Sequence, residues 1–197
     1  MIEVYINGQL VDAQIEGEET VGDVLKSFEM TCEENDAAVI GILVNGKQIT
    51  ADIFDEEAKK NLDKNTKFEC SVVTKNDIKA SFTKLSELFN ELSVQMENVP
   101  MELQKGNNKE VSISIKQLAD SIDQFCHIAT LATLFPDTFT STEVNGLNFN
   151  DFFKDFSPIL KDFEEALQSN DSVMIGDLAE YEICPRLQSI SDALKKM

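Results

Sequence analysis

Two Asn-Gly dipeptides, Asn7-Gly8 and Asn45-Gly46, lie within apolar, β-rich runs in the first part of the 197-residue chain. A type I′ turn needs positive φ at both central residues, a conformation that Asn followed by Gly tolerates well. Flanked by strand patterns, the dipeptide is a strong short-range signal for a β-hairpin. The front of the chain is therefore expected to form a small sheet with one helix, and the remainder follows a helical pattern.

The residues around these turns alternate as strands do. Apolar side chains recur at every second position, and the run 37–44 is apolar throughout, which is typical of a strand covered on both faces. Thr20 can cap a helix whose Asp23 follows three residues later, in a shortened relative of the capping box. The pattern predicts strands over residues 2–6, 10–15, 37–44, 47–49 and 68–73, with a helix after Thr20.

This order of elements resembles the β-grasp fold of the ubiquitin-like proteins over residues 1–74. The run from Ile42 to Ile49, ILVNGKQI, looks like the hairpin between that family's third and fourth strands. Carriers of the family act through a free C-terminal Gly-Gly, whereas here no two glycines are adjacent and the last strand runs into a helix. Unless the chain is first cleaved, the resemblance thus implies a docking sheet without carrier chemistry. Leu43 matches the central isoleucine of the family's usual binding patch, but Ser71 stands at the last-strand position.

The outer face of the predicted sheet, away from the helix, carries apolar side chains. Strict alternation places Tyr5, Val39, Leu43 and Val73 there. Four apolar residues on one face need a cover, which is either the chain's own second half or an outside partner. We take these four residues as the candidate partner-binding patch.

Residues 75–197 are predicted to form an all-α antiparallel bundle of about four helices. Two long seams follow spacings of three and four residues, as in helices packed at a shallow angle. The first seam comprises Ile78, Phe82, Leu85, Phe89, Leu92 and Met96, and the second comprises Phe149, Phe153, Phe156, Leu160, Phe163 and Leu167. Phenylalanine at this spacing favours a packed core over a ligand pocket. The whole chain is thus expected to be α+β, with domains at 1–74 and 75–197.

Two further helices complete the expected bundle. Ser114 and Gln117 predict a capping box for a helix that stops at Phe135-Pro136, and the last helix begins near residues 170–172. The connections 97–110 and 136–148 are longer than usual. Pro185 predicts a kink or break in the last helix. Pro158 either does the same to the preceding helix or opens a fresh one capped by Ser157.

The charge balance narrows the classes of partner. Asp and Glu outnumber Lys and Arg by 36 to 17, so a polyanion would be repelled and nucleic-acid binding is not expected. The acidity suits a basic partner or plain solubility. No apolar stretch approaches the roughly 20 residues that span a bilayer, and the first residues read as a strand, without a signal sequence. We expect a cytoplasmic protein without membrane contact.

Nothing in the pattern indicates catalysis. His127 is the only histidine, and its neighbour Cys126 points elsewhere on a helix, so the two do not form a base–nucleophile pair. One histidine and four scattered cysteines do not supply a zinc, haem or di-metal site. Three of the cysteines fall at inward positions. We expect no catalytic residue, no metal and no cofactor, and only weak calcium binding at 33–36 or 55–57 stays open.

The segment 177–186 is the one chemically dense stretch. Glu182 and Arg186 are four residues apart and oriented to pair, and Tyr181 lies beside them. Two interpretations stay open: a recognition spot on a kinked helix, or a kink held by an ion pair with Tyr181 partly buried in the core. We take Tyr181, Glu182 and Arg186 as a secondary polar site.

The sequence thus favours a non-enzymatic binding or scaffold protein. It would recognise another protein through the outer sheet face or through the bundle surface. The alternative is an acidic cytoplasmic chaperone for a secretion or flagellar export substrate. Partner identity and oligomeric state do not follow from the pattern.

Overall fold

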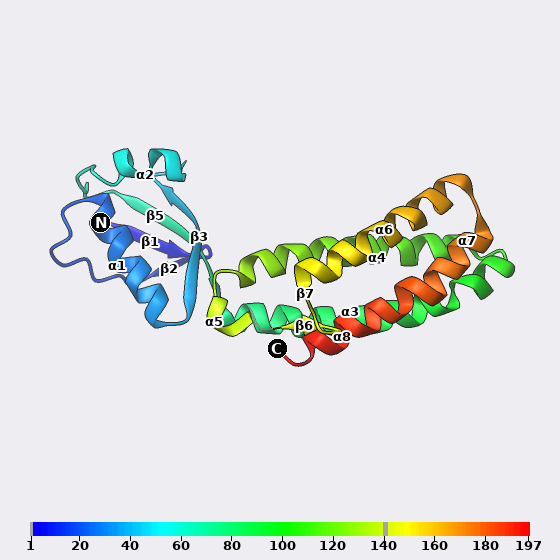
Figure 1. Cartoon of the computed structure of the whole chain (residues 1–197). Helices are drawn as coiled ribbons and strands as arrows, with labels where there is room; N and C mark the ends of the chain where they lie inside the picture. The colour runs from blue at the N-terminus through cyan, green and yellow to red at the C-terminus, as the bar shows by residue number, and fades with distance from the viewer. Residues whose placement is uncertain (1, 140–141) are drawn as a thin grey trace. The chain divides into compact units, whose positions relative to one another are not determined.

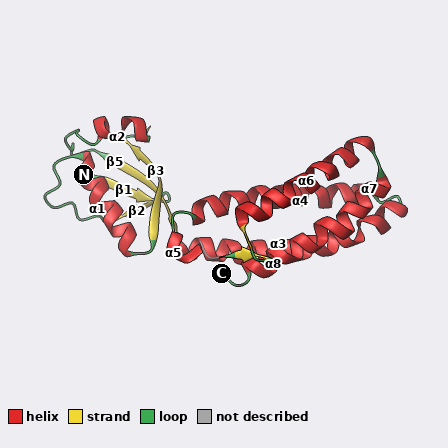
Figure 2. Ribbon diagram, in the orientation of Figure 1, coloured by secondary structure: helices red, strands yellow, loops and turns green. Residues whose placement is uncertain are grey.

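The computed structural model describes residues 2–139 and 142–197 (Figure 1). The chain divides into two compact units, Met1–Asp77 and Ile78–Met197. The first combines a mixed sheet with helices and the second is mainly helical, so the fold is α+β (Figure 2). Among the described helices, none has both the length and the apolar character needed to cross a bilayer.

The first unit is built on a five-stranded sheet in the order β2-β1-β5-β3-β4. The central strand β5 runs parallel to β1 and antiparallel to β3. The elements are β1 (Glu3–Ile6), β2 (Gln9–Val11), α1 (Val21–Glu34), β3 (Ala37–Val44), β4 (Lys47–Gln48), α2 (Ala51–Glu57) and β5 (Lys67–Thr74).

Both Asn-Gly turns join paired antiparallel strands, as the sequence predicts. Asn7 and Gly8 have φ values of 50° and 80°, and Asn45 and Gly46 have values of 51° and 77°. The first turn links β1 to β2 and the second links β3 to β4. Positive φ at each of these four residues is what the two-residue hairpin requires.

Helix α1 begins at the predicted cap. The Thr20 hydroxyl accepts a hydrogen bond from the Asp23 amide at 3.2 Å, and the Asp23 carboxylate accepts one from the Thr20 amide at 2.9 Å. Hydrogen bonds from Thr20 hold the pKa of Asp23 below its usual value. The helix lies on one sheet face, where the core of this unit forms from Val4, Val21, Val24, Leu25, Val44 and Phe68.

Strand β3 contains a β-bulge that overturns one face assignment. Val39 pairs with Val72 and Gly41 pairs with Ser71, so Ile40 is the extra residue. The bulge breaks the alternation between Ile42 and Val39, and Val39 therefore shares the α1 side of the sheet with Val72. The prediction that Val39 lies on the outer face with Tyr5 is wrong for this reason.

The second unit has more helical segments than the four expected. They are α3 (Lys75–Gln104, which begins at the end of the first unit), α4 (Asn108–Ala132), α5 (Pro136–Phe139), α6 (Phe149–Ser169), α7 (Ser172–Asp177), the π-helix η1 (Leu178–Ile183) and α8 (Cys184–Leu194). A short hairpin of β6 (Glu143–Val144) and β7 (Leu147–Asn148) precedes α6. Its turn is a third Asn-Gly pair, Asn145-Gly146, within a stretch that we expected to be a loop.

Several predicted helix ends are also wrong. Helix α3 continues through Pro100 to Gln104, and α6 continues through Pro158, so neither proline ends its helix or opens a new one. Helix α4 already begins at Asn108, and the Ser114 hydroxyl donates to the Glu110 carbonyl inside it, where a cap was expected. The kink or break predicted at Pro185 does not appear as a break, because α7, η1 and α8 follow one another without a gap; the irregularity is the π-helical turn, which ends two residues before the proline.

Aromatic packing holds the helical unit together. The ring of Phe125 on α4 lies 6.2 Å from the rings of Phe82 and Phe89 on α3, between ring centroids. It lies 5.0 Å from Phe149 and 5.1 Å from Phe153 on α6. The two predicted seams therefore meet at α4, and these phenylalanines form a packed core, as expected.

Candidate functional site

The outer face of the sheet is more polar than the sequence suggested. Tyr5 pairs with Glu69, and Glu69 pairs with Leu43, so the central strand places a carboxylate between the two apolar residues. Lys67 lies 2.7 Å from the Glu69 carboxylate and 4.5 Å from the centre of the Tyr5 ring. The remaining patch residue, Val73, is buried and pairs with Ala38. Tyr5, Leu43 and Val73 share this face without forming one continuous apolar surface.

Val39 instead lines a groove between α1 and β3. The groove has a volume of about 720 Å³, and its other apolar walls include Leu25, Phe28, Ile40 and Phe54. Strand β4 pairs only with Leu43 and Val44, the last two residues of β3. The rest of that edge of β3 has no strand neighbour among the described residues. A bulge on such an edge opposes pairing with another strand.

The surface of α7 and η1 is the strongest candidate site in the helical unit. Asn170 ends α6 with a φ of 55°, and the Asp171 carboxylate then caps α7 by accepting from the Met174 amide at 3.0 Å. In the π-helical turn that follows, the Cys184 amide donates a hydrogen bond to the Ala179 carbonyl, five residues earlier in the chain. Such turns are rare and occur often at functional sites.

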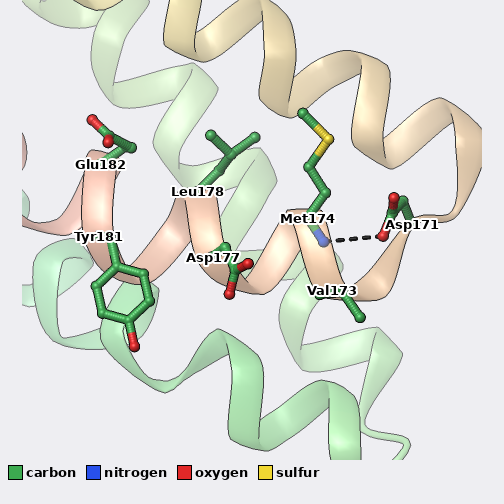
Figure 3. A pocket seen from close by; sticks show the side chains of 7 residues that line it. All are labelled: Asp171, Val173, Met174, Asp177, Leu178, Tyr181 and Glu182. Carbon is green, nitrogen blue, oxygen red and sulfur yellow. Dashed lines mark hydrogen bonds between the residues drawn. The ribbon is translucent and has the colours of Figure 1, made fainter.

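A shallow hollow of about 430 Å³ follows this helical surface (Figure 3). In the view of Figure 3, Met174 and Leu178 project to one side of the helix, and Val173, Asp177 and Tyr181 project to the other. Two apolar side chains here are unusually open to solvent, since Val173 is 72% exposed and Tyr181 is 63% exposed. The lining residues are Asp171, Val173, Met174, Asp177, Leu178, Tyr181 and Glu182.

The hollow is acidic at its polar positions. Asp171, Asp177 and Glu182 line it, and the Glu180 carboxylate beside Tyr181 raises the pKa of that phenol through a hydrogen bond. Tyr181 is too exposed for the core position that one interpretation of the sequence gave it. Because no Lys or Arg is among the lining residues, the hollow favours a cationic partner group.

Arg186 does not line this hollow but anchors the helix that forms it. Its Nη1 donates to the Glu182 carboxylate at 2.7 Å, which is the ion pair that the spacing predicts. Its Nη2 donates to Asp155 on α6 at 3.0 Å. Of the secondary polar site, Tyr181 and Glu182 therefore face the hollow, while Arg186 ties η1 and α8 to α6.

The neighbouring helix α3 approaches α7 closely. A Cβ on Gly176 would lie 3.3 Å from the Cβ of Pro100, so glycine permits this contact. Of the eight large apolar side chains exposed in the described part of this unit, six lie within residues 94–113 or 173–181. These stretches belong to the half of the helical unit that ends in the α3–α4 and α6–α7 connections (Figure 1).

Sequence reasoning missed Val173 and Met174. Both lie outside the stripe that runs through the buried Ile175. The sequence did contain a sign of their exposure: the two apolar residues lie beside a helical stripe that already supplies the core contacts. Such residues remain on the surface once the stripe is buried.

The titratable groups offer little nucleophilic chemistry. Burial raises the pKa of Cys70 to about 11 and also raises the pKa values of Cys32 and Cys184, which keeps these thiols protonated. Cys126 is exposed on α4, yet its pKa is raised as well, by desolvation and by Asp123. In the portion of the chain that the structure covers, no group of three or more His, Cys, Asp or Glu side chains could hold a metal ion.

Comparison with known proteins divides the chain in two. Residues 2–74 match the TP0873 N-terminal domain, and residues 80–193 match the domain of unknown function DUF8042. A protein of Treponema pallidum (strain Nichols), described as an uncharacterized protein, is 26% identical over 196 residues. The match covers 100% of this chain and 98% of that protein.

No solved structure matches the chain. The DUF8042 match covers more than half of the 197 residues and includes the whole α7–η1 surface. The chain belongs to the DUF8042 family.

Proposed function

We propose that this protein is a non-enzymatic binding protein that holds a segment of another protein on its α7–η1 surface. The observation that carries the proposal is the exposure of Val173 and Tyr181, which project to the same side of the helix among acidic side chains, while the exposed Met174 lies on its other side. Large apolar side chains gathered on one surface are typical of an interaction site. The partner segment would be apolar with basic flanks, because the hollow offers apolar contacts and carboxylates together.

The energetics fit a reversible interaction. Fully burying a large apolar side chain contributes about 1.5–3 kcal/mol, so three of them supply several kcal/mol before the costs of association. Carboxylates at the rim add more to the association rate and to specificity than to affinity. Three such side chains supply at most about 9 kcal/mol, and association costs at least about 4 kcal/mol, so these contacts alone support a complex weaker than micromolar, which needs about 8 kcal/mol.

The first unit fits the same kind of function. We propose that it is a ubiquitin-like β-grasp module, supported by its strand order, its parallel β1–β5 pair and the helix α1 on one face. Four cysteines without a disulfide suit a reducing compartment, so we place the protein in the cytoplasm.

Site-specific photo-crosslinking tests the proposed surface. Benzoylphenylalanine would replace Val173 in the full chain within the native cell, and a matched control would replace Gln188, an exposed polar residue on α8. We expect a discrete crosslinked partner at position 173 and none above background at position 188. Equal capture at both positions would contradict the proposal.

The captured partner then permits a quantitative test. Val173→Asp should weaken its binding by at least about tenfold, because the substitution removes apolar contact and adds a like charge to the acidic hollow. Gln188→Asp adds the same charge elsewhere and should change the affinity less than about twofold. An exported protein as the partner would favour the export-chaperone alternative over a general scaffold.

A further inference from the structure

Three residues that line the α7–η1 hollow form a row along one side of the helix. Val173, Asp177 and Tyr181 follow one another at intervals of four residues and project to the same side in Figure 3. All three are exposed to solvent. We call them the exposed row. It offers a partner an apolar contact, then a carboxylate, then a second apolar contact.

The π-helical turn keeps the exposed row on one side of the helix. Four residues of a regular α-helix advance the side chains by about 400°, which is more than a full turn, so a row of every fourth residue winds around the axis. The step from Asp177 to Tyr181 crosses η1. A π-helical turn holds more than four residues, so four of them fall short of a full turn. The second step of the row therefore opposes the winding of the first.

The carboxylate in the middle of the exposed row has no cation beside it. Asp177 takes part in none of the ten ion pairs among the described residues, and its side chain does not cap η1. From residue 171 to residue 186 the only basic residue is Arg186, whose guanidinium already pairs with Glu182 and Asp155. A Lys or Arg of a partner would thus meet an uncompensated carboxylate between two apolar contacts.

The surroundings of the exposed row favour a helical partner over an extended one. The residues that line the hollow belong to α7, its cap or η1, so the hollow has no strand edge that could pair with an extended backbone. A helix satisfies its own backbone N–H and C=O groups and needs only side-chain contacts. Its positions i, i+3 or i+4, and i+7 share one face and span about 10 Å, close to the rise of at most about 12 Å from Val173 to Tyr181.

We infer that the partner segment is an amphipathic α-helix with a Lys or Arg between two large apolar residues. The two apolar residues, at positions i and i+7, contact Val173 and Tyr181, and the basic residue between them pairs with Asp177. This inference rests on the proposed function of the α7–η1 surface and specifies the partner that this surface holds. A second copy of the chain does not fit, because pairing the surface with itself would bring its carboxylates against one another.

The segment captured by crosslinking at position 173 provides the probe. A synthetic, isotope-labelled peptide of about 20 residues, centred on the crosslinked residue, spans about 30 Å as a helix and is bound to the full chain. We expect Cα chemical shifts typical of a helix over at least about two turns. A proline placed in the middle of these turns should abolish binding, because it breaks the helix. Shifts typical of an extended chain would overturn the inference and leave the proposed function intact.

A charge exchange tests the contact with Asp177. Asp177→Lys should weaken binding of the peptide by about tenfold or more, and replacing the basic residue of the peptide with Glu should restore it to within about threefold of the original pair. The matched control is Asp162→Lys, at an exposed position of α6 that does not line the hollow, and it should weaken binding by less than about threefold. Circular dichroism shows whether each variant keeps its fold.

The inference and the proposed function fail in different ways. If position 173 captures no partner above the level at position 188, both fail. If a partner is captured but its segment is extended, lacks a basic residue between apolar ones, or does not recover binding on charge exchange in folded variants, only the inference fails. Capture of a second copy of this chain would also overturn the inference.

Discussion

Asn7 and Asn45 each join the central strand in addition to turning the chain. The Asn7 side chain donates to the Val72 carbonyl at 3.0 Å and accepts from the Val72 amide at 2.9 Å. The Asn45 side chain accepts from the Lys67 amide at 2.9 Å. The turn positions were predictable because the Asn-Gly signal is local. The bonds to β5 were not, since their partners lie 65 and 22 residues away.

Substitution of Asn7 should separate these two roles. Asn7→Gly keeps the left-handed conformation but removes both bonds to Val72, which should cost about 1–2 kcal/mol of stability. Asn7→Ala should cost about 1 kcal/mol more, because alanine disfavours a φ near 50°. Hydrogen exchange at the Val72 amide measures the effect. Unchanged exchange in Asn7→Gly would show that the side-chain bonds contribute no stability.

At the scale of elements, the presence of a strand or helix was easier to predict than an irregularity within it. The apolar run of β3 identified a strand, and Gly41 inside it was the available sign of a bulge. Strict alternation ignores that sign, so Val39 was assigned to the wrong face. The expected connection 97–110, which contains Pro100, and the proline at 158 indicated helix ends, yet α3 and α6 continue through both prolines. In α6, buried residues lie on both sides of Pro158, whereas in α3 the buried residues all precede Pro100. Tertiary packing outweighs the local cost of a proline, which is about 3 kcal/mol.

The two internal prolines should therefore respond differently to replacement. Pro158 is exposed, so Pro158→Ala restores a backbone N–H to α6 and should stabilise the protein by about 1–3 kcal/mol. Pro100→Ala serves as the comparison, because it also removes ring contact with the backbone near Gly176 and should gain less. Thermal unfolding of the two variants gives the order, and a lower melting temperature for Pro158→Ala would contradict this account.

At the scale of the whole molecule, the succession of a sheet unit and a helical unit followed from a change of periodicity in the sequence. The two heptad seams identified the helices that meet at Phe125, because helix packing repeats along the chain. The α7–η1 hollow was only half predicted. Tyr181 and Glu182 stood out by their chemistry, whereas the exposure of Val173 depends on which helix faces the neighbours cover.

The net charge of −19 should make stability depend on salt. Like charges on a compact molecule repel one another, and salt screens that repulsion. Raising NaCl from about 10 mM to about 300 mM, which shortens the screening length, should stabilise the protein by about 1 kcal/mol or about 2–4 °C. The ten ion pairs found among the described residues weaken under the same change, but eight of them join side chains that are each at least about a fifth exposed, and such pairs contribute little. Thermal scans with sucrose as the uncharged control test this, and a falling melting temperature would count against it.

The π-helical turn also changes the phase of the helix that contains it. Each residue of an α-helix advances the side chains by about 100°, so an extra residue in one turn rotates everything beyond it relative to everything before it. The stripe of α8 through Leu187, Ile190 and Leu194 is fully buried, while Val173 before the turn points to solvent. The continuous helix from α7 to α8 thus has a buried face after the π-helical turn and a solvent-facing side before it, and the turn sets the angle between them. Its inner stripe serves packing, and its outer residues can vary with the partner without disturbing that packing.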